Sequence, residues 1–183
     1  MKRIIAMVLM VCIVALGGGS VYAHTVEEAT PLEENLNVFE GEGGFKGQRG
    51  QRRFDIIKEL RDEIQQLNQL KIQRLELKIE VTERQGTILD LTINARENQM
   101  KEELQQAKEV RQEIKDIHDQ LKEYREEVKA EVESFREAVK NHEIEEAREH
   151  IENIINIKTT INSMISEKIL LLDEIIEILT VEI

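Results

Sequence analysis

Histidine and carboxylate side chains are the groups of this chain that could bind a metal ion or transfer protons. A Glu-x-x-His pair on each of two helices would indicate a di-iron or di-manganese carboxylate centre. The positions three residues before His118 and His150 are Lys115 and Ala147, so this spacing is absent. Glu146 and His150 lie four residues apart, which is typical of a solvated pair on one helix face. We therefore expect no metal and no cofactor.

Nucleophilic side chains form no catalytic pattern either. Ser134, Ser163 and Ser166 fall within helical charge patterns and have no evident base beside them. The sequence contains no Gly-rich phosphate loop, no Gly-x-Ser-x-Gly elbow and no His-Glu-x-x-His motif. Numerous Glu residues do not by themselves make an acid–base pair. The sequence therefore predicts a protein that is not an enzyme.

The composition is acidic and poor in aromatic residues. The 183 residues include 37 Asp and Glu against 25 Lys and Arg, a net charge of −12, and 3% aromatic residues. This balance would repel the phosphates of nucleic acid, so we expect no nucleic acid partner. A compact enzyme core usually draws on more aromatic residues, whereas long helices rich in Glu, Lys, Leu and Ile do not need them. A single Cys excludes a disulfide framework.

The first 23 residues have the pattern of a secretory signal peptide. Lys2 and Arg3 precede an apolar run of 13 residues, Ile4–Leu16, and small residues follow up to Ala23. The run is shorter than the ~20 residues that a transmembrane helix needs. We therefore predict cleavage after Ala23, a secreted, periplasmic or cell-envelope protein, and no stable membrane span. Cleavage would remove Cys12 and change the net charge from −12 to −14.

Residues 24–53 have the composition of a flexible, acidic and Gly-rich linker. They contain Pro31 and the Gly-rich stretch 41–50. Low apolar content and repeated glycine do not offset the entropy lost on ordering. A small basic cluster lies at the end of the linker beside two phenylalanines, and it consists of Lys46, Arg49, Arg52 and Arg53 with Phe45 and Phe54. This cluster could contact an anionic envelope surface or nucleic acid, or it could be a solvated linker.

Beyond the linker the sequence predicts a helical coiled-coil domain over residues 54–183, with helices at about 54–84, 88–140 and 143–180. Apolar residues recur at steps of three or four, and charged residues fill the gaps. This spacing is typical of amphipathic helices with a heptad-like seam.

Two breaks in the seam set these boundaries. The phase is lost at Gly86, a residue that disfavours the helix interior, and Thr87 could cap a new helix. The second break follows Lys140, where Asn141 could adopt the left-handed conformation that ends a helix. Short turns place consecutive helices antiparallel. The predicted fold is therefore all-α, an elongated antiparallel three-helix coiled-coil bundle with a disordered N-terminal tail.

The second half of the last helix is apolar around most of its circumference, which indicates more than one neighbouring helix. With a turn at Gly86, three helices would overlap there, and only two would overlap near Asn141. The residues that we expect to form this core or protein-contact face are Ile169, Leu172, Ile175, Ile176 and Leu179. In the alternative interpretation, the same face is an oligomer interface or binds a client protein.

The charge-rich, secreted and all-helical pattern over residues 54–180 resembles the small periplasmic stress chaperones of the Spy/CpxP type and, more loosely, Skp/OmpH-like coiled-coil chaperones. The local likeness to the Leu-Thr-x-x-Gln motif of the Spy/CpxP type is Leu91-Thr92-Ile93-Asn94-Ala95, in which Ala95 replaces the Gln. Those chaperones are typically basic, whereas this chain is acidic. The resemblance is therefore one of class, and it assigns no binding residue.

These observations predict a secreted, non-enzymatic helical protein that binds other proteins or envelope components, with a holdase-like periplasmic chaperone as one form. The alternative is a structural coiled-coil spacer or an oligomerisation protein of the cell envelope. A homo-oligomer is compatible with either function.

Overall fold

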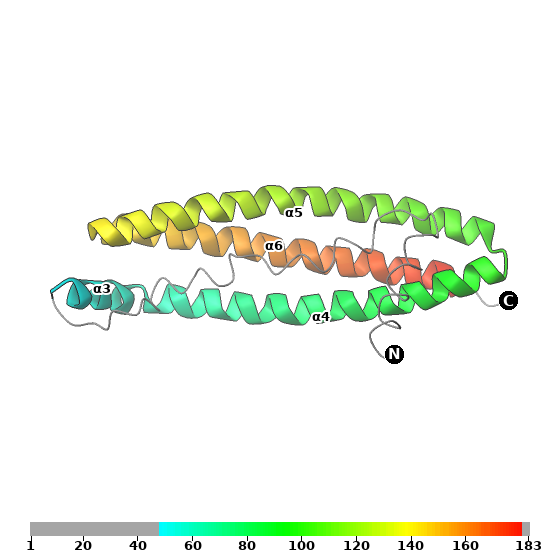
Figure 1. Cartoon of the computed structure of the whole chain (residues 1–183), viewed down its shortest axis with the longest axis horizontal. Helices are drawn as coiled ribbons and strands as arrows, with labels where there is room; N and C mark the ends of the chain where they lie inside the picture. The colour runs from blue at the N-terminus through cyan, green and yellow to red at the C-terminus, as the bar shows by residue number, and fades with distance from the viewer. Residues whose placement is uncertain (1–47, 181–183) are drawn as a thin grey trace, which may run out of the picture. The chain divides into compact units, whose positions relative to one another are not determined.

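The computed structural model describes residues 48–180, with side chains from Phe54 onward, and this part of the chain confirms the all-α prediction. It contains four helices and no strand: α3 (Gln48–Glu59), α4 (Arg61–Glu97), α5 (Lys101–Asn141) and α6 (Ile144–Leu179) (Figure 1). The predicted signal peptide, its cleavage after Ala23 and most of the predicted linker lie outside the described residues. Within 48–180, no helix is both long enough and apolar enough to span a bilayer.

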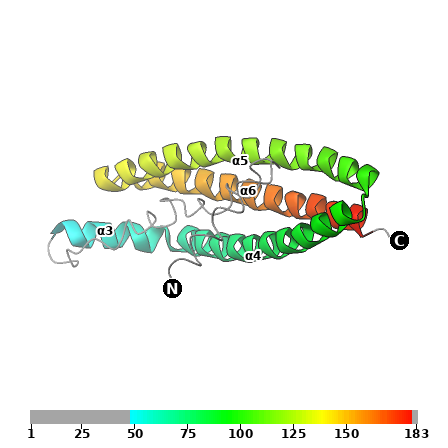
Figure 2. The same ribbon diagram turned by 45° about the vertical axis from the view of Figure 1, so that its right-hand side comes forward.

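Helix α6 packs against both α4 and α5, whereas α4 and α5 contact each other little. Figures 1 and 2 show α6 between the other two long helices. Glu63 pairs with Arg148, and Arg84 pairs with Asp173, at sequence separations of 85 and 89. Nearly constant separations mean that α4 and α6 run in the same direction. Helix α5 runs antiparallel to α6, with which it shares a short turn.

The first turn lies at Asn98–Met100, and the turn predicted at Gly86 is not present. Gly86 is in the interior of α4, which continues to Glu97. Thr87 does not cap a helix, since its Oγ1 donates to the carbonyl of Glu83 one turn earlier, at 3.3 Å. This is the usual hydrogen bond of a threonine inside a helix. A lone glycine costs a helix only about 1 kcal/mol, which the packing of a long helix can offset.

Both turns end their helices with the same hydrogen-bonding pattern. At the first, Gln99 has a φ of 59°, and the Met100 N–H donates to the Ala95 carbonyl at 2.9 Å. At the second, His142 has a φ of 67°, and the Glu143 N–H donates to the Ala138 carbonyl at 2.9 Å. Each is a Schellman motif with a non-glycine residue in the left-handed position. That position at the second turn belongs to His142 and not, as predicted, to Asn141.

The helical region begins earlier than predicted, because α3 starts at Gln48 and not at Phe54. Arg49, Arg52 and Arg53 of the basic cluster therefore belong to a helix and not to a linker. The chain bends at Leu60, but hydrogen bonds continue across the bend. The Leu60 N–H donates to the Ile56 carbonyl at 2.9 Å, and the Ile64 N–H donates to the Leu60 carbonyl at 3.0 Å. Leu60 and Ile56 are both buried.

All three long helices contribute to one hydrophobic core near the Asn98–Met100 turn. Its buried members are Ile88, Ala95, Ala107, Val110, Leu172, Ile175 and Leu179. Ala95 and Ala107 are fully buried, and their small side chains allow α4 and α5 to approach each other beside the turn.

The expected two-helix tip near Asn141 is absent, because the displaced first turn lengthens α4. Glu63, near the start of α4, pairs with Arg148, near the start of α6. Helix α4 therefore lies alongside α6 from near the start of α6 to near its end. The overlap of three helices is not confined to the second half of α6.

Candidate functional site

The predicted core or contact face of the last helix points into the molecule. Ile169, Leu172, Ile175 and Leu179 are buried, and Ile176 is partly buried against the three-helix core. These side chains are covered by α4 and α5 of the same chain. They are therefore not available to a second protein while the helices stay packed.

Exposed apolar side chains gather instead on α4. Five of the seven large apolar residues that are exposed in the described part of the chain belong to this helix: Ile72, Leu75, Ile79, Leu89 and Ile93. Their exposed fractions range from 43% to 60%. The remaining two are Phe54 on α3 and Leu170 on α6. A row of half-exposed leucine and isoleucine is unusual for a solvent-facing helix surface, whereas single ones are common.

The exposed residues of α4 follow a heptad repeat. Starting at Ile72, alternate steps of three and four residues lead through the whole row, which we call the outer stripe: Ile72, Leu75, Ile79, Thr82, Gly86, Leu89 and Ile93. Isoleucine occupies three of the four a positions and leucine occupies two of the three d positions. Gly86 lies at the remaining a position, where an added Cβ would meet nothing within 4 Å. The outer stripe is therefore an uncovered coiled-coil seam.

The outer stripe lies on the side of α4 that faces away from α6. Ile79 is half-exposed and Ile88 is buried, and nine residues at 100° each place their side chains about 180° apart. The buried side contains Leu67, Leu70 and Ala95 as well. Helix α4 is thus apolar on two opposite faces, and the fold covers one of them.

Polar contacts between α4 and α6 fix the rotation of α4. The Nε of Arg84 donates to Oδ1 of Asp173 at 2.7 Å, and the carboxylate of Asp173 raises the pKa of Arg84. Near the other end, Arg148 pairs with Glu63 and donates to the backbone carbonyl of Glu59 at 3.2 Å. These contacts lie toward both ends of the interface, and they fit the rotation of α4 in which the outer stripe faces away from α6.

A buried asparagine adds a third fixed point. Asn162 on α6 is the buried polar residue among the described side chains, at 7% exposure. Its Nδ2 donates to the Leu70 carbonyl at 3.0 Å, and its Oδ1 accepts from Nε of Arg74 at 3.3 Å. A buried asparagine that is satisfied in one register and not in others selects that register.

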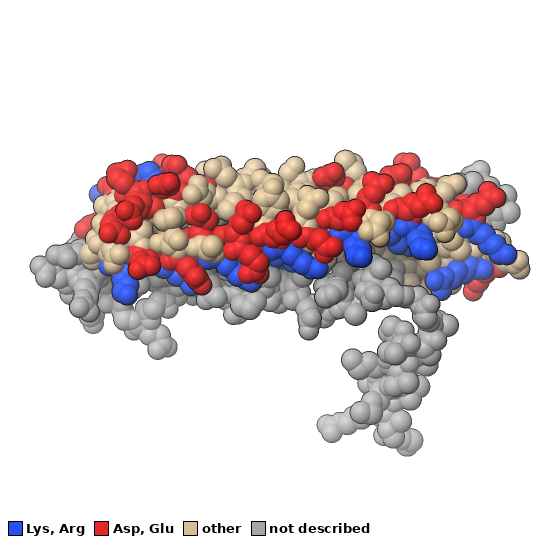
Figure 3. Space-filling view, turned by 90° about the horizontal axis from the view of Figure 1, so that it is seen from above, with Lys and Arg blue, Asp and Glu red and all other residues tan. Residues whose placement is uncertain are grey.

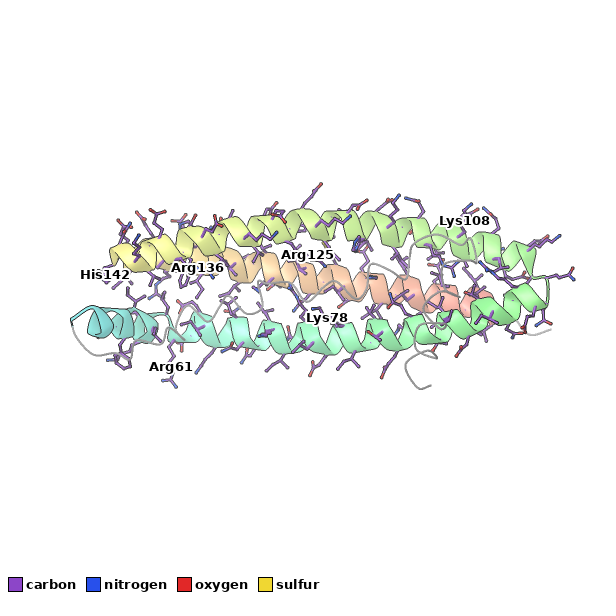
Figure 4. The ribbon with its side chains drawn as sticks, viewed as in Figure 1. Arg61, Lys78, Lys108, Arg125, Arg136 and His142 are labelled. Carbon is purple, nitrogen blue, oxygen red and sulfur yellow. The ribbon has the colours of Figure 1, made fainter. Side chains whose placement is uncertain are left out.

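Charged residues flank the outer stripe with opposite signs on its two sides. Lys71 and Lys78 precede two of the a positions, and Glu76 and Glu83 follow two of the d positions. Lys78 lies near the middle of α4 in Figure 4. In coiled coils these g and e positions form ion pairs between helices and set their orientation. The stripe thus has both an apolar seam and charged edges.

The structure does not bring the histidines and serines into one site. Nδ1 of His150 lies 2.8 Å from Oε2 of Glu131 on α5, a residue on another helix than the predicted neighbour Glu146. His142 lies at the tip where α5 ends (Figure 4), and Ser166 donates to the Asn162 carbonyl at 3.1 Å. The described residues contain no group of three or more His, Cys, Asp and Glu side chains that could hold a metal ion.

The face of the molecule seen over α5 is predominantly acidic. In Figure 3, acidic side chains run along its length, and basic side chains lie mostly toward one edge. Such a face repels anionic ligands. It therefore differs from the outer stripe of α4, where apolar residues are flanked by both signs of charge.

The turn that the sequence predicts at Gly86 divides α4 and interrupts the heptad repeat of the outer stripe. The signal that could have found it is the continuous alternation of three and four residues from Ile72 to Ile93 through Gly86 itself. No protein-family model, curated protein or solved structure matches the chain.

Proposed function

We propose that this chain is a non-enzymatic coiled-coil assembly protein of the cell envelope, which binds a partner helix with the outer stripe of α4. In this proposal the protein is secreted, loses residues 1–23, and presents an elongated three-helix bundle behind a flexible N-terminal tail. The observation that carries the proposal is the uncovered heptad seam from Ile72 to Ile93.

The spacing of the outer stripe favours a helix as the partner. A second helix packs its side chains into a row that repeats every 3.5 residues, whereas an extended peptide or a small ligand has no such repeat. The row is also long, since 22 residues of α4 from Ile72 to Ile93 extend about 33 Å. A partner helix of similar length would remove all five apolar residues from water.

A holdase-like chaperone is the second candidate. Leu170 is 69% exposed and Phe54 is 48% exposed, and both lie outside the heptad row. An unfolded client requires no register, so these side chains and the outer stripe could together contact it. The class-level resemblance to extracytoplasmic helical chaperones supports the same function.

One pair of variants separates these functions. Ile79→Glu places a charge in the centre of the outer stripe, and Leu170→Glu is its matched control on α6, because both replaced side chains are at least 60% exposed. The secreted protein is treated with a mild crosslinker. We expect wild type and Leu170→Glu to give the same crosslinked species, and Ile79→Glu to lose them. If Ile79→Glu crosslinks as wild type does, the outer stripe is not the binding surface.

Aggregation of an unfolded client protein tests the chaperone. Scattered binding predicts protection at a stoichiometric ratio that both Ile79→Glu and Leu170→Glu reduce in part. Failure to protect at any ratio excludes the holdase function and leaves the assembly function standing.

A further inference from the structure

We infer that the partner of the outer stripe is α4 of a second copy of this chain, arranged parallel and in register. This inference rests on the proposed function, and it adds the identity and the direction of the partner helix. Three features of α4 support it: the residue types along the seam, the charges beside it and its position on the bundle.

The residue types along the outer stripe are those of a parallel two-stranded coiled coil. Ile72, Ile79 and Ile93 occupy a positions, and Leu75 and Leu89 occupy d positions. In parallel dimers, a β-branched residue at a packs alongside the partner helix, and leucine at d points toward it. This combination favours two strands over three or four.

The flanking charges select the parallel direction. In a parallel pair, a g residue lies beside the e residue that follows it by five positions on the other chain. Lys71 then meets Glu76, and Lys78 meets Glu83, and the two-fold symmetry of the dimer makes each pair twice. The complementarity is therefore a property of one sequence paired with itself.

The antiparallel direction opposes like charges. In that arrangement g residues meet g residues and e residues meet e residues. In the register that places Ile72 opposite Ile93, Lys71 and Lys78 would face Thr92 and Gln85 of the other copy and would lose their acidic partners. The acidic e positions Glu76 and Glu83 would oppose each other. Like charges across a helix interface are destabilising. The charges at the g and e positions thus favour the parallel orientation and disfavour the antiparallel one.

The position of the outer stripe leaves room for a second bundle. Because the stripe is on the side of α4 opposite to α6, two copies can join through α4 while α5 and α6 of each copy lie outside the junction. An isologous contact of this kind closes at two copies and does not propagate.

The middle of the seam lacks large apolar side chains, which weakens the dimer. Gly86 contributes no side chain at its a position, and Thr82 occupies a d position with its Oγ1 donating to the Lys78 carbonyl at 2.9 Å. Gly86→Ile would fill the gap with the residue that the other a positions use. We expect this variant to lower the dimer dissociation constant at least about tenfold.

Sedimentation equilibrium across a wide concentration range tests the dimer. We expect wild type and Leu170→Glu to move from a monomer mass to a dimer mass, Gly86→Ile to do so at lower concentration, and Ile79→Glu to stay monomeric. A wild-type protein that stays monomeric at every concentration overturns the inference. If crosslinks to another protein still depend on Ile79 in that case, the proposed function stands and only the second copy is excluded.

Engineered thiols test the direction. The processed protein from residue 24 onward contains no native cysteine, and in this background Ile72→Cys and Ile93→Cys are each oxidised alone and as a mixture. A parallel dimer in register crosslinks each variant to itself, because each position meets its own copy. An antiparallel dimer gives crosslinks in the mixture alone, and this result would overturn the parallel arrangement. Leu170→Cys is the control, and it is expected to give no crosslink.

Discussion

Replacing Gly86 by alanine should stabilise this protein. Gly86 lies in the interior of α4, and a Cβ added there would meet nothing within 4 Å. The substitution therefore adds no clash and removes the conformational freedom of glycine in the unfolded chain. Alanine in a helix interior is favoured over glycine by about 0.5–1 kcal/mol.

Urea and thermal unfolding followed by circular dichroism measure this gain. For a helical region of this size, we expect a rise in Tm of roughly 2–5 °C. Gln73→Ala is the matched control, because it is also an exposed position of α4, and its change should be a few tenths of a kcal/mol. Both proteins are compared at low concentration, so that association does not contribute to the result.

A second substitution at the same position, Gly86→Pro, tests whether α4 is continuous. Gly86→Pro should cost about 3 kcal/mol or more if α4 is continuous, because proline removes a hydrogen bond and clashes with the preceding turn. If position 86 were the turn that the sequence suggests, proline would be tolerated and alanine would bring little gain. A loss of stability in Gly86→Ala together with tolerance of Gly86→Pro would refute the continuous helix.

Four further substitutions test the two turns and the inner and outer faces, and the N-terminus of the mature protein tests the predicted cleavage. Gln99→Gly and His142→Gly should each stabilise by about 1 kcal/mol in urea unfolding, because both residues have positive φ angles, which glycine adopts without strain. Ile175→Ala should cost about 2–5 kcal/mol, since its side chain is buried where three helices meet. Ile79→Ala should change the stability of the monomer by less than about 0.5 kcal/mol, and an equal loss in both isoleucine variants would contradict the assignment of inner and outer faces. Mass spectrometry of the secreted protein should give an N-terminus directly after Ala23, and a retained leader would contradict the processing.

The all-α class could be predicted because the sequence offers nothing that interrupts long helices. From Phe54 onward it contains no proline and a single glycine, and apolar residues recur at helical spacing. The region of the second turn could be predicted too. A lysine and an asparagine precede the turn, and acidic residues begin the next helix, as the helix dipole favours. The residue with the positive φ, His142, could not be predicted, because histidine has no strong preference for that conformation.

The first turn could not be predicted, because its local signals contradict the packing. Gly86 disfavours a helix by about 1 kcal/mol, yet Ile88 and Ala95 continue the buried face on its far side. The actual turn has Gln99 in the left-handed position, where no glycine marks the end of the helix. The position of the turn is set by the packing of α4 against α6 along the whole length of α4. Such contacts join residues that are far apart in the sequence, and a local pattern does not show them.

The outer stripe also shows why amphipathicity alone is an incomplete guide to this chain. Helix α5 has one apolar side and fits the simple pattern, but α4 has two, so its apolar residues do not single out an inner face. The inner face also carries polar contacts that fit this rotation of α4: Arg84 meets Asp173, and Arg148 meets Glu63. These partly exposed ion pairs add to the burial of Leu67, Leu70, Ile88 and Ala95 in setting which apolar row of α4 faces α6. Arg84→Glu should therefore destabilise the packing of α4 on α6 by about 1 kcal/mol in urea unfolding, and adding Asp173→Arg should restore part of this loss; no recovery in the double variant would contradict the role of the pair.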